Sequence, residues 1–164
     1  MAGSGPMGDL EYLVARQEVA DVLARFCERI DEYDIDAVAE LFTEDCVTDY
    51  GPGRGGRVVG RQALAERLRT GQEEFARTHH QLGQMTVRFD GPDTCHASTY
   101  VTAWHERFDG STPVVRLRYL DRLVRSGNRW RIAERRALAQ GAEGFPGVEW
   151  RWVARRRPGC GREP

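Results

Sequence analysis

The fold of this chain is decided by residues 82–139, LGQMTVRFDGPDTCHASTYVTAWHERFDGSTPVVRLRYLDRLVRSGNRWRIAERRALA. Apolar and polar residues alternate here with the period of two that is typical of strands. Turn signals divide the stretch at 90–93, 109–110 and 126–128. The pattern predicts four antiparallel strands over 82–89, 95–108, 113–124 and 130–139.

The residues before this stretch follow the helical period instead. Apolar side chains recur every three to four residues from Leu10 to Phe26, and Asp9 can cap the helix that they predict over 9–31. Further helices are predicted over 35–42 and 61–75, with strands over 46–50 and 57–59. Helices followed by strands favour an α+β fold. We expect a cone-shaped α+β barrel, in which three N-terminal helices close a curved, mostly antiparallel sheet around an internal pocket.

Length and composition fit one globular domain. The chain has 164 residues, of which 40% are hydrophobic and 30% are charged. A chain of this length buries a core without stabilising cross-links. We divide it into a flexible leader (1–8), the cone domain (9–140) and a C-terminal extension (141–164). The end of that extension, rich in Arg, Gly and Pro, is predicted to be disordered.

Charge and hydropathy argue against several classes of partner. The formal net charge of −1 gives no bulk field that favours nucleic acid or a membrane surface. The sequence contains no apolar run of about 18 residues, so no membrane span is predicted. We expect a cytoplasmic location. The cysteines lack the spacing of a zinc site or a redox pair and are expected to be free thiols. We predict no metal and no cofactor.

A carboxylate and a phenol end two of the predicted elements. Asp31 ends the apolar stripe of the first helix, and Tyr50 ends the first strand beside the glycine-rich loop 51–56. On spacing alone, Asp31 is more readily a helix-end carboxylate than a site residue. A carboxylate that points inward needs a partner, since its pKa otherwise rises.

Histidines stand near the start of the first long strand and within the next one. Neighbouring residues of a strand face opposite sides, so an inward Leu82 implies an inward His80 and an outward His79. On its own, an inward His80 is more readily a core histidine than a catalytic one. His105 lies in the next strand.

These side chains together form a set suited to proton transfer. A histidine can abstract or return a proton. A carboxylate on its other ring nitrogen fixes the tautomer and stabilises the imidazolium, and a tyrosine can donate to a developing oxyanion.

Three segments resemble the SnoaL-like pattern of the nuclear-transport-factor-2-like superfamily. The first is FCERIDEYDID at 26–36 with LFTED at 41–45, in which an aspartate ends the first helix. The second, THHQLG at 78–83, is similar to the strand entry that holds a pocket histidine. The third, with Tyr119, Asp121, Trp130 and Arg135, is similar to the closing hairpin. The resemblance covers about residues 10–140, and the pattern looks most like the scytalone dehydratase branch.

The resemblance implies specific roles for four residues. His80 would be the general base and Asp31 would orient it, while Tyr50 and His105 would polarise the substrate oxygen or hold the leaving group. Scytalone dehydratases eliminate water from a small phenolic substrate, lindane dehydrochlorinase resembles them in its Asp–His pair, and polyketide cyclases and ketosteroid isomerases share the cone. Ile30 stands where the dehydratase has a tyrosine.

We therefore expect a cofactor-independent acid–base enzyme, either a dehydratase or lyase, or a cyclase or isomerase with the same His–Asp dyad. The alternative is a non-catalytic cone that binds a small molecule or dimerises. The expected partner is a small-molecule substrate, without nucleic acid or membrane. Substrate-binding residues are expected to be Phe26, Ile30, Leu82, Tyr100, Trp104 and Tyr119. Trp104, Trp130, Trp150 and Trp152 are predicted to face outward, which favours a homodimer or homotrimer formed through the sheet.

Overall fold

A computed structural model describes residues 8–155 of the chain. The predictions of a flexible leader and a disordered end therefore lie outside the described residues, apart from Gly8 and Arg155. The elements are α1 (Asp9–Asp31), α2 (Ile35–Glu40), β1 (Phe42–Asp49), a 3-10 turn (Pro52–Arg54), β2 (Arg57–Val59), α3 (Arg61–Gln72), β3 (Phe75–Phe89), β4 (Thr94–Arg107), β5 (Val114–Ser126) and β6 (Arg129–Glu143).

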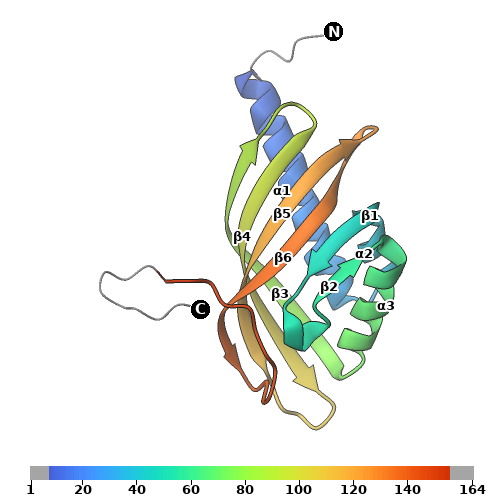
Figure 1. The fold of residues 1–164 in the computed structure, drawn as a ribbon, viewed down its shortest axis with the longest axis vertical. Helices are drawn as coiled ribbons and strands as arrows, with labels where there is room; N and C mark the ends of the chain where they lie inside the picture. Colours follow the sequence, from blue (N-terminus) through green and yellow to red (C-terminus); the bar gives the residue numbers. More distant parts are fainter. Residues whose placement is uncertain (1–7, 156–164) are drawn as a thin grey trace.

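The predicted α+β fold is confirmed, but the sheet is open and not closed into a barrel. Its strand order is β2-β1-β6-β5-β4-β3, and only the β1–β6 pair is parallel. β2 and β3 lie at opposite edges, and β2 has only three residues. Figure 1 shows the long strands β3 to β6 curving across α1, while α3 lies beside β1 and β2. The helices therefore cover the side of the curved sheet that further strands would close in a barrel.

Three strands extend well beyond the ranges that the sequence predicts. β1 begins at Phe42 and not at residue 46, at the end of the range predicted for the second helix. β3 begins at Phe75 and not at residue 82, because its first half is an edge strand whose residues 76–81 lack a regular apolar alternation. β6 continues to Glu143, three residues into the predicted C-terminal extension. His80 consequently lies inside a strand, with neighbours on both sides that hold its direction.

α1 is buried along only part of its predicted apolar face. Leu10 and Leu13 are exposed, and burial begins at Ala15, because the first turns project past the sheet (Figure 1). At the other end Tyr33 has a φ of 60°, and the Asp34 N–H donates to the Arg29 carbonyl at 2.9 Å. This left-handed residue reverses the chain immediately after the helix.

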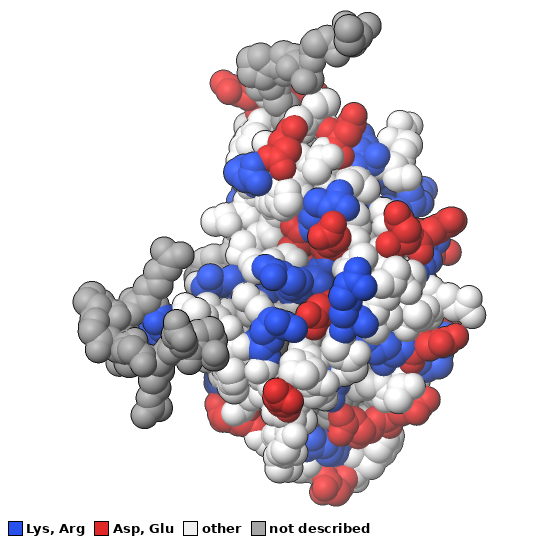
Figure 2. Space-filling model, in the orientation of Figure 1, with Lys and Arg blue, Asp and Glu red and all other residues white. Residues whose placement is uncertain are grey.

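The outer face of the sheet is polar, and one of the tryptophans predicted there is buried instead. Arginine side chains gather across the middle of this face (Figure 2). Trp130 is only 3% exposed, and its indole N–H donates to Glu18 at 3.1 Å, so the prediction that it faces outward is wrong. Trp152 is exposed, whereas Trp104 and Trp150 are half-buried. None of the helices in residues 8–155 has the length and apolarity that a membrane crossing requires.

Candidate active site

The Asp31 carboxylate and the His80 imidazole are in direct contact. Asp31 Oδ1 lies 2.6 Å from His80 Nδ1. The Thr78 hydroxyl donates to the same oxygen at 2.7 Å, and the backbone N–H of His80 donates to Oδ2 at 2.8 Å. Three donors thus hold both oxygens of one carboxylate.

The local structure explains why these groups meet. β3 is an edge strand that pairs only with β4, so alternate backbone N–H groups lack a strand partner, and Asp31 satisfies the one at His80. Thr78 and His80 are two residues apart and share a face of the strand. Asp31 is the last residue of α1, where the helix dipole disfavours a negative charge. Residues that break such a local rule are typical of functional sites.

The electrostatics keep this carboxylate ionised. Burial acts to raise the pKa of Asp31, but the hydrogen bonds from His80 and Thr78 outweigh burial and hold the pKa below its ordinary value. The short contact then requires His80 Nδ1 to carry a proton, since an ionised carboxylate can only accept. Nε2 is therefore the basic nitrogen of the neutral ring, and within residues 8–155 it has no hydrogen-bond partner.

His80 lies in the wall of a cavity of about 60 Å³. Such a space holds a few water molecules, whereas pockets that enclose organic ligands have volumes of roughly 300 Å³ or more. Phe145 and Trp150, from the segment after β6, form part of the wall. An organic substrate therefore requires these side chains to move. Of the residues predicted from the sequence, the wall contains Phe26, Ile30, Tyr50, His80, His105 and Tyr119.

His105 faces the cavity beside His80. Their ring centres are 5.6 Å apart in an edge-on arrangement, because the strand register places His105 opposite Thr78, two residues from His80. Burial, assisted by the neighbouring His80, lowers the pKa of His105 to about 4. His105 is therefore neutral at pH 7 and can hydrogen-bond to a substrate without adding charge.

This lowered pKa predicts a pH-dependent loss of stability. Between the ordinary histidine pKa of about 6.5 and the folded value of about 4, the unfolded state binds more protons, so stability falls as the pH falls. By linkage the loss at pH 5 is about 2 kcal/mol. Urea unfolding of wild type and His105→Phe at pH 7.5 and pH 5 measures it, with exposed His79→Gln as the control. Equal pH dependence in wild type and His105→Phe would contradict the assignment.

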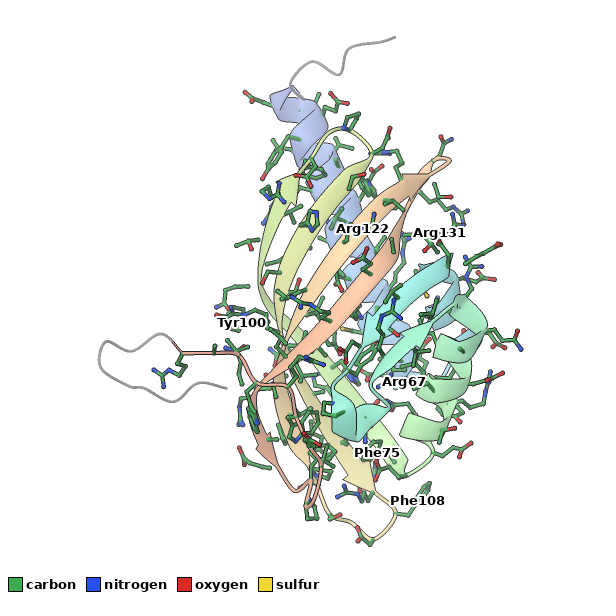
Figure 3. The ribbon with its side chains drawn as sticks, viewed as in Figure 1. Arg67, Phe75, Tyr100, Phe108, Arg122 and Arg131 are labelled. Carbon is green, nitrogen blue, oxygen red and sulfur yellow. The ribbon has the colours of Figure 1, made fainter. Side chains whose placement is uncertain are left out.

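Tyr50 and Arg67 also belong to the wall of this cavity. Tyr50 directly follows β1 and is 8% exposed, and its hydroxyl has no partner within the described residues. The guanidinium carbon of Arg67, from α3, lies 3.9 Å from the centre of the Tyr50 ring. Figure 3 marks Arg67 between α3 and the strands. Arg67 is absent from the residues predicted from sequence, although it follows Leu64 by three residues on the inward side of α3, which is a usable signal.

Three residues predicted to bind substrate do not line the cavity. The odd-numbered residues 95–105 of β4 are buried, while the even-numbered ones between them are exposed or half-buried. Tyr100 and Trp104 therefore point away from the cavity and are absent from its wall. Because neighbours in a strand face opposite sides, Trp104 and His105 cannot both line it. Leu82 packs against the core without reaching the cavity wall.

Two other kinds of site, a metal centre and an open groove, have less support within the described residues. Residues 8–155 contain no group of three or more His, Cys, Asp or Glu that could hold a metal. A larger, open groove of about 660 Å³ lies between α1, α2 and the β5–β6 hairpin. Neither Asp31 nor His80 borders it. The small cavity is therefore the candidate active site.

Comparisons with known proteins agree with this fold. The sequence pattern of the SnoaL-like domain matches residues 11–136, whereas no curated protein matches the chain in sequence. A provisionally assigned scytalone dehydratase from Novosphingobium aromaticivorans DSM 12444 superposes with a TM-score of 0.84 and 19% identity, covering 90% of this chain and 98% of the other. The hexachlorocyclohexane dehydrochlorinase LinA type 2 gives a TM-score of 0.76 and 14% identity, covering 93% and 99%.

A third structure has a higher sequence identity. A Mycobacterium tuberculosis protein of unknown function is 26% identical, with a TM-score of 0.72 and coverage of 83% of this chain and 78% of the other. Together with the family match, these likenesses confirm the resemblance and the fold that the sequence predicts.

Proposed function

We propose that this chain, which belongs to the SnoaL-like domain family, is a cofactor-independent acid–base enzyme that removes water from a small cyclic or polyketide-like molecule. The observation that carries the proposal is the 2.6 Å contact of Asp31 with His80, whose side chain lines a cavity that Asp31 itself does not line. A binding or dimerisation module has no need of such a pair, so the contact favours an enzyme. A dehydratase and a dehydrochlorinase among the similar folds support elimination as the reaction type.

The geometry supports one balanced proton-transfer cycle. His80 Nε2 takes a proton from the carbon next to a substrate carbonyl, and the C–H electron pair moves to form a carbon–carbon double bond. The bond between the β-carbon and its hydroxyl oxygen breaks, and the oxygen keeps that electron pair. The imidazolium returns its proton to the leaving hydroxide, so that water is released and His80 is neutral again. Ionised Asp31 stabilises the imidazolium between the two transfers.

Two further groups suit the substrate oxygen. The Tyr50 hydroxyl lies at the cavity without a protein partner in the described chain, and neutral His105 lies beside His80. A hydrogen bond from either group to a carbonyl strengthens as negative charge develops on that oxygen.

A cyclic β-hydroxyketone such as 3-hydroxycyclohexanone tests the proposal. We expect the full chain to form the conjugated enone about 100-fold or more faster than buffer alone, as measured by ultraviolet absorption. The same reaction run in D₂O and followed by NMR separates the alternatives. An isomerase or cyclase with this dyad incorporates deuterium next to the carbonyl without forming the enone, and a binding module does neither. Failure to accelerate either process across a panel of cyclic β-hydroxyketones would refute the dehydratase assignment.

A further inference from the structure

We infer that the substrate carries a carboxylate group, which Arg67 and Tyr50 bind in the cavity that His80 also lines. The inference rests on the proposed function, because only an enzyme has a substrate. The binding of a carboxylate is nevertheless tested without turnover. Arg67 is a charged side chain of the cavity wall that has no counter-ion within residues 8–155.

The contacts of Arg67 leave most of its donors free. Its Nε–H donates to the Arg54 carbonyl at 2.8 Å, and its stem packs against Gly55. Among the described residues, no partner is found for its four remaining N–H donors. The nearby carboxylate of Asp49 is engaged elsewhere, because it accepts from the Gly51 N–H and from Arg151.

The surroundings of Arg67 are those of a ligand site. The guanidinium lies on the face of the Tyr50 ring and borders the cavity. Burial lowers the pKa of Arg67, so an anion bound beside it would stabilise the charged guanidinium. The second observation is independent: the Tyr50 hydroxyl, in a side chain more than nine-tenths buried, has no partner in the described chain. A free fork of guanidinium donors and a free phenol in one wall suit a single oxyanion.

The charge of the site favours a carboxylate among oxyanions, because one guanidinium offsets one negative charge whereas a phosphate carries up to two. A planar guanidinium binds a planar carboxylate through two parallel hydrogen bonds. The Asp31 carboxylate takes its hydrogen bonds from Thr78 and His80, and within the described residues it forms no ion pair with Arg67. With Tyr50 on the carboxylate, His105 remains for the substrate carbonyl beside His80, and the bound carboxylate sets the position of the carbon on which the dyad acts.

Calorimetric titration of the full chain with benzoate and with its neutral isostere benzamide tests the inference. We expect wild type to bind benzoate about 10- to 100-fold more tightly than benzamide. Arg67→Met should remove this preference, and Arg67→Lys should retain part of it. Arg69→Met is the matched control, because Arg69 lies on the same helix in an exposed pair with Asp36, and it should bind benzoate as wild type does. Acetate serves as a smaller probe, and inorganic phosphate as a tetrahedral one.

The outcomes separate this inference from the proposed function. Equal affinity for benzoate and benzamide, no binding of benzoate or acetate, tighter binding of phosphate, or an unchanged preference in Arg67→Met would each overturn it. Tyr50→Phe gives a second test if Arg67→Met does not fold, and a several-fold weaker binding of benzoate is expected. With β-hydroxyketones, Arg67→Met should raise KM for an acidic substrate and leave kcat nearly unchanged. A dehydratase that accepts neutral substrates equally well would retain the proposed function and lose the carboxylate site.

Discussion

Asp31→Asn is expected to lower kcat by about 1,000- to 10,000-fold while the fold stays intact. Asparagine keeps the size of the side chain, but its amide NH₂ donates where the carboxylate accepted. His80 Nδ1 would then have to accept, and the proton would move to Nε2, which could no longer take one from the substrate. Steady-state kinetics on the β-hydroxyketone that the wild type accepts measures the loss, and circular dichroism checks the fold.

Two neighbours of the dyad provide matched controls. Asp34→Asn changes the same residue type three positions on, where the exposed carboxylate caps α2 and asparagine caps equally well. His79→Ala removes a histidine next to His80 that faces outward and is exposed. Both controls should keep turnover within about twofold, whereas His80→Ala should cost at least as much as Asp31→Asn because His80 itself takes the proton. An Asp31→Asn protein that retained a tenth of the wild-type kcat would remove the dyad from the mechanism.

The sequence predicts most of this fold because its signals are local. The period of two in residues 82–139 and the turns between the strands depend only on neighbouring residues. The first half of β3 is missed because an edge strand can be polar on much of its surface, and its pairing with β4 is not visible in its own residues. The openness of the sheet is visible only in the structure for a related reason, since no local pattern says whether the outermost strands meet.

Local signals likewise predict only part of the candidate site. Strand parity correctly orients His80 inward, and the family resemblance singles out Asp31 at the end of a helix. Parity applied to β4 would also have removed Tyr100 and Trp104, because His105 occupies the opposite face. The spacing from Leu64 places Arg67 on the inward side of α3, but its contact with the Tyr50 ring, seventeen residues earlier on a separate element, is not visible in the sequence.

The second large expected effect is on stability, and it depends on an ion pair that is buried beneath the cavity. Asp121 on β5 lies opposite Arg135 on β6, and two hydrogen bonds of 2.8 and 2.9 Å join them. Both side chains are 0% exposed. Burial acts to lower the pKa of Arg135, but Asp121 outweighs burial and raises it. The guanidinium carbon lies 4.2 Å from the centre of the Phe26 ring and 4.1 Å from that of Tyr119, and both rings line the cavity.

Asp121→Ala is expected to lower the free energy of unfolding by about 3–5 kcal/mol, because it leaves the Arg135 guanidinium buried without its counter-ion. The double variant Asp121→Leu with Arg135→Met removes both charges, and it should recover most of that loss because apolar side chains of similar volume replace the pair. Arg122→Met is the control, since Arg122 pairs with Glu134 on the same two strands but on the outer face, where an ion pair is worth at most about 1 kcal/mol. Guanidinium chloride unfolding of the four proteins measures the differences. If Asp121→Ala were no more destabilising than Arg122→Met, water would have to reach the Arg135 guanidinium. The region beneath Phe26 and Tyr119 would then not be dry in solution.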